Sequence, residues 1–145
     1  MAKSAWMAAR DAQVALYRKS HGKLGASIGS HPLLLLSVTG RKTGAVHTVP
    51  LAYVRDGEDV VIAASKGGAD TDPLWLANLE ANPAVRVQVG ADEDAAHATI
   101  RGVGADRDRR YAMCVAQGGG FADYEKKTAR VIPVVRLARD SDGRP

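Results

Sequence analysis

The sequence predicts a mainly β (α+β) protein: an antiparallel barrel or half-barrel of about six strands with an N-terminal helix and peripheral helices. Short apolar or alternating runs are joined by hairpin signals such as Asp56-Gly57, and few helical segments separate them. The parallel βαβ alternation of a dinucleotide-binding fold is absent, and no GxGxxG motif follows the first strand. At 145 residues the chain fits one domain with one core.

The N-terminal segment, residues 4–19, predicts a helix because it is rich in alanine and contains neither glycine nor proline. Arg18 and Lys19 lie at its C-terminal end, where positive charge suits the helix dipole. We interpret it as a helix that packs on the domain; the alternative is an interfacial helix that faces anionic lipid. Residues 20–30 contain three glycines and predict a flexible linker, so residues 1–30 form a helix and linker ahead of the barrel.

The barrel is expected over residues 31–138, and residues 139–145 are expected to form a disordered tail. Pro50 indicates that its strand lies at an edge or carries a bulge. An acidic turn, residues 92–94, is expected between the fourth and fifth strands. The expected strands are residues 33–39, 46–55, 60–65, 85–89, 96–103 and 131–137.

Two helices are expected beside the barrel. The first begins with Asp72 as its N-cap and Pro73 in the first helical position, and it ends near Asn82 because a proline follows. The second spans residues 105–117, with Asp106 as its cap, and a run of three glycines ends it.

The composition excludes several functional classes. The net charge of +4 favours acidic ligands, but the basic residues are scattered among acids, so no nucleic-acid partner is expected. The single cysteine, Cys114, excludes an internal disulfide, and the four histidines show no metal-ligand spacing. Residues 1–10 lack the apolar region of a secretory signal, and the longest apolar run, residues 32–36, is too short to span a bilayer. A cytoplasmic location is expected.

Two glycine-bearing basic turns are the strongest functional signal. The first basic turn is residues 39–44 (Thr-Gly-Arg-Lys-Thr-Gly), and the second basic turn is residues 64–68 (Ala-Ser-Lys-Gly-Gly). Each ends a predicted strand, and cationic side chains beside exposed backbone N–H groups bind anions. Either turn alone also fits a solvated hairpin. Together, with a helix N-terminus following Pro73, they predict a shared site for a phosphorylated acidic small molecule.

Side chains near these turns are further candidates. Trp75 and Asn78 lie three apart and share a helix face; Trp75 either walls a planar ligand or packs in the core. Leu76 and Leu79 are expected in the core. Tyr124 either orients or protonates a substrate, or it pins the C-terminal strand.

His47 either donates a hydrogen bond to an acidic ligand or is a partly exposed strand residue that titrates near neutral pH. Cys114 is expected to be a small buried hydrophobe. No Ser-His-Asp set in a recognisable motif and no paired catalytic carboxylates are present.

An ordered set of motifs covering about residues 34–137 resembles the deazaflavin-dependent nitroreductases of actinobacteria. The closing segment, residues 124–135, resembles that family's C-terminal signature. The other motifs are Thr39-Gly40-Arg41-Lys42-Thr43-Gly44, Val49-Pro50-Leu51, Asp56-Gly57, Ala63-Ala64-Ser65-Lys66-Gly67-Gly68, Pro73-Leu74-Trp75-Leu76-Ala77-Asn78-Leu79 and Ala81-Asn82-Pro83.

The resemblance implies a split β-barrel that binds coenzyme F-420, an 8-hydroxy-5-deazaflavin with a phosphate and an oligoglutamate tail. It implies that Tyr124 faces the substrate and that Ser65 assists protonation; no metal is implied. The residues implied to meet the phosphate and tail are Arg41, Lys42, Thr43 and Lys66, with His47 where family members carry an arginine. Those implied to line the deazaflavin and its linker are Pro50, Leu51, Ala64, Ser65, Gly67, Gly68, Leu74, Trp75 and Asn78.

The departures from the family pattern concern the acceptor side. Ala52 stands where an aromatic is common, and Gly118 and Phe121 stand in a segment where family members use tyrosines. The substrate pocket is therefore expected to be wider and less polar than in those members, and His47 is expected to make a weaker, pH-dependent contact with the tail.

The expected activity is hydride transfer from reduced coenzyme F-420 to a quinone, an activated alkene or a nitro compound. The alternatives are a non-catalytic deazaflavin carrier and a split-barrel reductase that binds FMN. The expected partner is a small-molecule hydride acceptor, and the protein is expected to be a monomer or homodimer. Weak peripheral contact of the N-terminal helix with a membrane is the alternative to a purely cytoplasmic location.

Overall fold

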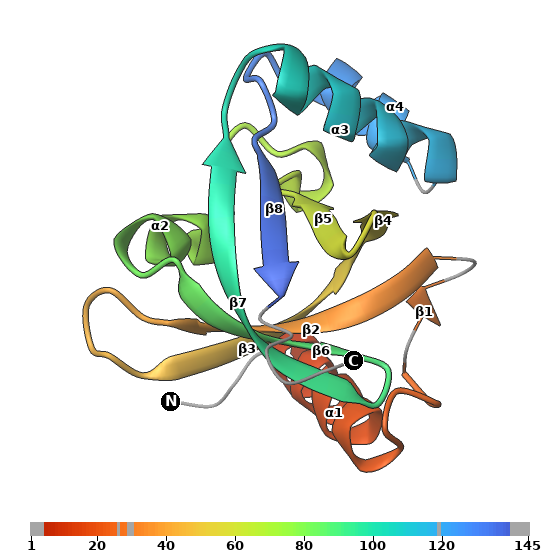
Figure 1. The fold of residues 1–145 in the computed structure, drawn as a ribbon, viewed down its shortest axis with the longest axis vertical. Coiled ribbons are helices and arrows are strands. Elements are labelled where there is room, and N and C mark those ends of the chain that lie inside the picture. The colour runs from red at the N-terminus through yellow and green to blue at the C-terminus, as the bar shows by residue number, and fades with distance from the viewer. Residues whose placement is uncertain (1–4, 26, 29–30, 119, 140–145) are drawn as a thin grey trace.

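The computed structural model describes residues 5–25, 27–28, 31–118 and 120–139, and within them eight antiparallel strands form one strongly curled sheet (Figure 1). The strand order is β1-β2-β6-β7-β8-β5-β4, and β3 pairs with β2 outside this path. The strands are β1 (Ser27–Ile28), β2 (His31–Thr39), β3 (Val46–Ala52), β4 (Val54–Asp56), β5 (Asp59–Ala63), β6 (Ala84–Val89), β7 (Asp92–Arg101) and β8 (Val134–Arg139). This architecture confirms the predicted antiparallel split barrel.

The helices lie around the sheet. In Figure 1, α3 and α4 lie together beyond one end of β7 and β8, whereas α1 lies beneath β2 and β3 at the opposite end. None of the described helices combines the length and apolarity needed to cross a bilayer. The helices are α1 (Ala5–Lys19), the 3-10 helix η1 (Lys66–Gly68), α2 (Leu74–Ala81), α3 (Ala105–Gln117) and α4 (Phe121–Lys127).

Strand β2 is buried on both faces, which explains its unbroken run of leucines. Leu34 and Leu36 face the main core inside the barrel, whereas Leu33 and Leu35 pack against α1. Because successive side chains of a strand point to opposite faces, a strand covered on both sides reads as a continuous apolar run rather than an alternating one.

Helix α1 packs on the barrel through Val14 and Tyr17, both of which are buried. The Tyr17 hydroxyl accepts from the Gly90 N–H at 2.8 Å and donates to the Leu33 carbonyl at 3.0 Å. Burial raises the pKa of this phenol, with the nearby Gly90 N–H acting in the opposite direction. The N-terminal helix is therefore part of the folded domain, as predicted.

The strand pattern was predicted well near tight turns. Asp56 pairs with Asp59, which confirms the Asp56-Gly57 hairpin, and Gly57 has φ +65. Pro50 lies on β3, which pairs only with β2 among the described strands, so the edge position is confirmed. The single strand expected over residues 46–55 is instead broken at Tyr53 into β3 and β4, and this break brings β4 onto β5.

Several boundaries differ from expectation. The acidic residues 92–94 begin β7 instead of forming a turn, because Gly90, at φ +63, makes the reversal two residues earlier. Strand β1 lies within the expected linker. Arg139, expected in the tail, is the last residue of β8, and residues 140–145 lie outside the described part of the chain.

The two predicted helix caps were wrong. Pro73 is the N-cap of α2, and the Asp72 carboxylate binds Arg130 instead of the helix N-terminus. Gly104 precedes α3, and Asp106, one residue into the helix, pairs with Arg109 and Arg110 at 3.6 and 3.5 Å. In both cases a guanidinium competes successfully for the carboxylate: one distant in the sequence for Asp72, and two from the same helix for Asp106.

Candidate functional site

The first basic turn closes the β2–β3 hairpin. Gly40 N–H donates to the Ala45 carbonyl at 2.7 Å, and Gly44 N–H donates to the Gly40 carbonyl at 2.9 Å. The side chains of Arg41, Lys42 and Thr43 are exposed. A tight, internally bonded turn therefore presents two cations to solvent.

Helix α2 is fastened to the first basic turn. Asn78 Oδ1 accepts from the Arg41 backbone N–H at 3.1 Å and from Arg41 Nη1 at 3.0 Å. One turn further along, Asn82 Nδ2 donates to the Thr39 carbonyl at 3.4 Å. Two sequence candidates 37 positions apart, Arg41 and Asn78, are thus in direct contact.

The second basic turn follows β5 and has the backbone shape of an anion-binding nest. Ser65 has right-handed helical dihedrals (φ −79, ψ −35), whereas Lys66 has φ +47, in the left-handed region. A right-handed residue followed by a left-handed one turns consecutive N–H groups into a shared concavity. The Lys66 side chain is exposed, and its Nζ donates to Thr71 Oγ1 at 3.3 Å.

Helix α4 lies against the second basic turn at a glycine. A Cβ added to Gly68, which has φ +86, would lie 3.0 Å from Lys127 Cβ and 3.2 Å from Tyr124 Cα. Only glycine allows both this positive φ and such close packing of α4 against the turn. The fold therefore brings the helix that carries Tyr124 to the turn that carries Ser65 and Lys66.

Arg130 is a residue that the sequence interpretation missed. Its Nη2 donates to the Ala64 and Ser65 carbonyls at 3.1 and 3.0 Å, and its Nε donates to the Ala69 carbonyl at 2.9 Å. Its Nη1 binds Asp72 Oδ1 at 2.9 Å. These partners lie 58 to 66 positions earlier in the chain, so no local pattern around Arg130 could have indicated them.

The remaining cofactor candidates lie on two sides of the barrel core. Leu51 and Trp75 are partly buried and pack against the main core, and Pro50 is half-buried opposite Leu35 on β2. Leu74 is 78% exposed at the start of α2. Trp75 therefore packs against the core, and because a part of its surface stays open, its role as a wall for a planar ligand stays a prediction.

His47 is exposed on β3 beside the first basic turn. A Cβ on the buried Gly40 would lie 3.2 Å from His47 Nε2. His47 also lines a cleft of about 460 Å³ between α1 and β3, together with Arg10, Asp11 and Arg18. The sequence interpretation did not connect the N-terminal helix with His47.

Tyr124 belongs to a row of aromatic rings. Phe121 makes edge-to-face contacts with Tyr111 (6.3 Å between ring centroids) and with Tyr124 (5.5 Å). The Tyr111 hydroxyl donates to the Phe121 carbonyl at 2.6 Å, and burial raises the Tyr111 pKa to about 12. Phe121, expected in a substrate segment, is therefore engaged in holding α4.

Cys114 lies on the buried face of α3, where burial raises the pKa of its thiol to about 11. This confirms the prediction of a small buried hydrophobe. In the part of the chain that the structure describes, no three His, Cys, Asp or Glu side chains are grouped as metal ligands.

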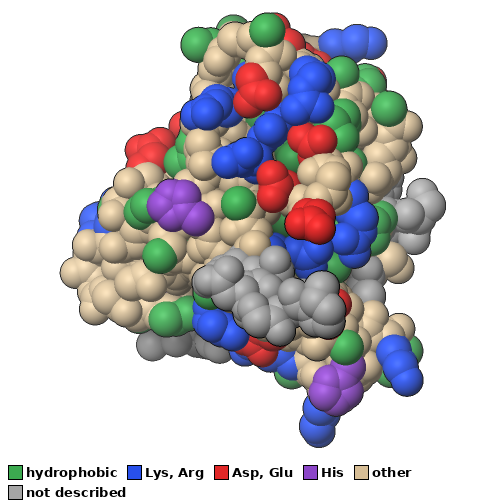
Figure 2. Space-filling view, viewed as in Figure 1, with side chains coloured by type: hydrophobic (Ala, Val, Ile, Leu, Met, Phe, Trp, Pro, Cys, Tyr) green, Lys and Arg blue, Asp and Glu red, His purple; other side chains and the backbone are tan. Residues whose placement is uncertain are grey.

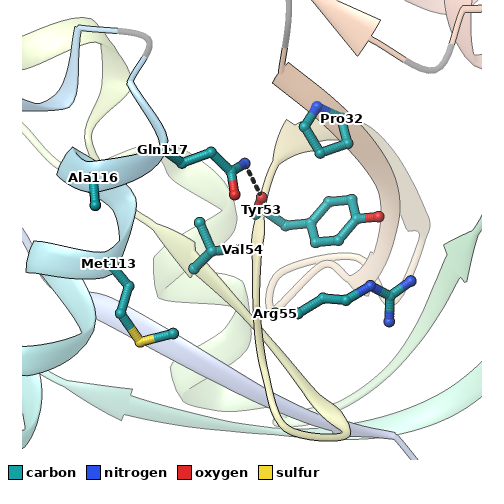
Figure 3. A pocket seen from close by; sticks show the side chains of 7 residues that line it. All are labelled: Pro32, Tyr53, Val54, Arg55, Met113, Ala116 and Gln117. Atoms are coloured by element: carbon teal, nitrogen blue, oxygen red, sulfur yellow. Dashed lines mark hydrogen bonds between the residues drawn. The ribbon is translucent and has the colours of Figure 1, made fainter.

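A second cleft lies away from both basic turns. Its volume is about 530 Å³, and Gln117 Nε2 closes one side by donating to the Tyr53 carbonyl at 2.7 Å (Figure 3). Figure 3 shows Met113 and Ala116 on α3 facing it from one side, with Tyr53 and Arg55 on the other. It contains no residue of the predicted site.

Charges of both signs are interspersed over the face shown in Figure 2, where Lys and Arg side chains alternate with Asp and Glu. Ion pairs such as Arg107–Asp108 and Arg109–Asp56, at 3.0 and 3.1 Å, join charges of opposite sign in the described part of the chain. This face has no continuous positive surface of the kind that binds nucleic acid.

The chain is similar to known proteins in both sequence and structure. The family described as F420H(2)-dependent quinone reductase matches residues 9–139. An F420H(2)-dependent quinone reductase of Mycobacterium tuberculosis (strain ATCC 25618 / H37Rv) is 38% identical over 128 residues, which cover 86% of each chain.

Two solved structures are also similar. One, titled as the structure of an F420-H2 dependent reductase (FDR-A), has a TM-score of 0.68 and 34% identity, and the match covers 73% of this chain and 93% of that chain. Another, titled as a domain-swapped dimer, has a TM-score of 0.70 and 30% identity over 92% of this chain and 99% of that one. The chain therefore belongs to the F420H(2)-dependent quinone reductase family.

Proposed function

We propose that this protein is an oxidoreductase that binds reduced coenzyme F-420 and transfers its hydride to a quinone. The observation that carries the proposal is the pair of exposed basic turns, each fastened to a helix of the predicted site: Arg41 to Asn78 on α2, and Gly68 against Tyr124 on α4. The family membership supports the same cofactor and the same class of acceptor.

The cations of the two turns are available to an anionic ligand. Among the ion pairs between described residues, none involves Arg41, Lys42 or Lys66. Arg41 is bound by the neutral Asn78 amide, which orients the guanidinium and leaves its charge uncompensated. The nest at Ser65–Lys66 adds backbone N–H donors. These features fit the phosphate and carboxylates of coenzyme F-420.

His47 extends this basic surface toward α1. It lines the cleft that also contains Arg10 and Arg18, and Arg18 Nη2 donates to Thr48 Oγ1 at 3.0 Å. In our proposal the oligoglutamate tail follows this direction from the first basic turn, with His47 as the nearest contact.

The deazaflavin ring would rest on half-buried apolar side chains, for which Leu51 and Trp75 are the candidates; Pro50, on the opposite face of β3, would contact the linker instead. When bound, the reduced cofactor supplies the hydride, which is the difficult part of the chemistry. Reduction of a quinone to a hydroquinone also consumes a proton. The Ser65 and Tyr124 hydroxyls are the proposed groups that hold or deliver it, since Ser65 lies in the second basic turn and the Cα of Tyr124 lies against Gly68 of that turn.

The proposal also includes a cytoplasmic location. Helix α1 buries Val14 and Tyr17 against the barrel, and these anchors are then no longer available to a lipid surface.

Equilibrium dialysis against coenzyme F-420 and FMN, followed by turnover with menadione, tests the proposal. We expect saturable binding of coenzyme F-420, weaker binding of FMN, and catalytic oxidation of the reduced deazaflavin by menadione. Saturable binding without oxidation would indicate a carrier, and preferential binding of FMN would indicate a flavin reductase.

A further inference from the structure

We propose that Arg130 is a positioning residue that holds the second basic turn in its anion-binding shape. This inference rests on the proposed function, because it assigns the turn to the phosphate of coenzyme F-420. Arg130 itself does not need to contact the cofactor: its guanidinium is directed into the protein and only 16% of the side chain is exposed.

The contacts of Arg130 use the fork geometry of a guanidinium. Four donated hydrogen bonds of 2.9 to 3.1 Å reach the carbonyls of Ala64, Ser65 and Ala69 and the carboxylate of Asp72. All four acceptors lie within one nine-residue segment, residues 64–72. A planar group with five fixed N–H donors can bind such a set at once, whereas a lysine ammonium offers three donors from a single point.

The turn needs this support because its backbone is in an uncommon conformation. Lys66 has φ +47, which is unfavourable for a residue with a Cβ, and this left-handed residue creates the nest. The Ser65 carbonyl accepts from Arg130 and from the Gly68 N–H at 2.9 Å. With the carbonyls on either side of the turn held by Arg130, the peptide planes of the nest are fixed relative to β5.

Arg130 also links the turn to α4. Its backbone N–H donates to Thr128 Oγ1 at 3.2 Å just beyond the helix, and the Pro133 carbonyl accepts from the Ala64 N–H at 2.9 Å. The first basic turn has no described contact with Arg130 and depends on Asn78 instead. Loss of Arg130 should therefore disturb only one half of the site.

Arg130→Lys is the test variant, because lysine keeps the positive charge but lacks the planar set of N–H donors of the guanidinium. We expect its dissociation constant for coenzyme F-420 to rise at least about tenfold, as for loss of a charge-assisted contact. Binding of the same deazaflavin after removal of its phosphate should change less than about threefold. The matched control is Arg139→Lys, since Arg139 is similarly buried (14% exposed) but pairs with Asp94 and donates to the Glu58 carbonyl, neither of which belongs to the proposed site. The control should bind as the wild type does.

Hydrogen exchange gives a readout that does not depend on the cofactor. In Arg130→Lys, the amides of residues 64–72 should exchange faster, while those of residues 40–45 stay as in the wild type. If this variant fails to fold, Asp72→Asn, which weakens one of the four bonds, is compared in the same two measurements with a smaller expected effect.

The outcomes separate the two proposals. Unchanged exchange in residues 64–72, or equal losses of affinity for the deazaflavin with and without phosphate, would overturn the positioning role. Absence of coenzyme F-420 binding to the wild type would overturn both the proposed function and the link to the cofactor, while faster exchange in residues 64–72 would then show that Arg130 shapes the turn for another purpose.

Discussion

Arg41 donates to the Asn78 side-chain oxygen twice, once from its backbone N–H and once from its guanidinium, at 3.1 and 3.0 Å. One amide oxygen therefore sets both the main chain of the β2–β3 turn and the direction of its arginine. The partner is neutral, so the turn keeps the positive charge with which we propose that it binds an anionic cofactor.

Replacement of Asn78 should weaken cofactor binding in a graded way. In Asn78→Ala both hydrogen bonds are lost, and the dissociation constant for coenzyme F-420 should rise by up to about 30-fold, since each bond contributes roughly 1 kcal/mol. Asn78→Asp should be more harmful than Asn78→Ala, because a carboxylate would neutralise Arg41. Gln13→Ala, which removes a bond from α1 to the Gly25 carbonyl, serves as control and should bind nearly normally. Equal affinities of the Asp and Ala variants would contradict the charge argument.

Two substitutions of Lys66 should separate binding from stability. Lys66→Ala and Lys66→Gly both remove the ammonium, and both should weaken binding of coenzyme F-420 by roughly 10- to 100-fold. Because Lys66 has φ +47, glycine should relieve backbone strain, so Lys66→Gly should be about 1 kcal/mol more stable than Lys66→Ala in urea unfolding. Lys23→Ala, at an exposed lysine outside the site, is the control for loss of one charge. Normal affinity in both Lys66 variants would remove this residue from the site.

Gly68 and Gly57 form a matched pair for measuring the contact between α4 and the second basic turn. Both have positive φ, but a Cβ on Gly68 would lie 3.0 Å from Lys127, whereas one on Gly57 would have nothing within 4 Å. Gly57→Ala should therefore cost about 1 kcal/mol from its backbone alone. Gly68→Ala should cost more, by about 1–3 kcal/mol, and should also change turnover through Tyr124. If Gly57→Ala and Gly68→Ala lost similar amounts of unfolding free energy, α4 would not pack against the second basic turn in solution.

The stability of the fold should fall in strongly alkaline solution. Below pH 9 the Cys114 thiol is protonated in both the folded and the unfolded protein, so it does not affect the pH dependence. Burial raises its pKa from 9.0 to about 11, so between these values the unfolded chain releases a proton that the folded protein keeps. The free energy of unfolding should then decrease with pH, by at most about 1.4 kcal/mol per unit from this group. The raised pKa of Tyr111, about 12, extends the decrease to higher pH.

Cys114→Ala is the control for this pH dependence. Urea unfolding between pH 8 and 11 should show a shallower decrease in the variant than in the wild type, whatever the absolute cost of the smaller side chain. A thiol reagent should label the folded wild type slowly at pH 8, because the thiolate is the nucleophile. Parallel pH profiles of the two proteins would contradict the assigned pKa.

Local rules predicted those parts of the fold in which neighbouring residues decide the structure. The helix over residues 105–117, the hairpin at Asp56-Gly57 and the helix end near Asn82 all depend on nearby glycines, prolines or periodicity, and all are confirmed. Helix α4 was not predicted from the sequence. It is held by the aromatic contacts of Phe121 with Tyr111 on another helix.

The site was only partly accessible to the same reasoning. Exposed turns that contain lysine and glycine can be recognised from the local sequence. Arg41 and Asn78 were both predicted as site residues, and the structure shows that they are in contact. The hydrogen bonds of Arg130 were not predicted, because most of its acceptors are main-chain carbonyls. Every residue has such a carbonyl, so the sequence does not distinguish these acceptors from others. The capping role expected of Asp72 failed for the same reason, since its actual partner is distant in the sequence.

The position of β8 sets the order in which this protein can be completed. Strand β8, which comes last among the described strands, is inserted between β7 and β5, in the interior of the sheet. Until residues 134–139 leave the ribosome, β5 and β7 each have an unpaired edge, and Arg130 is not yet in place beside residues 64–72. A nascent chain therefore exposes two strand edges whose unpaired backbone N–H and C=O groups can associate with other chains. Closure of the barrel and maturation of the second basic turn therefore both require the segment that contains Arg130 and β8.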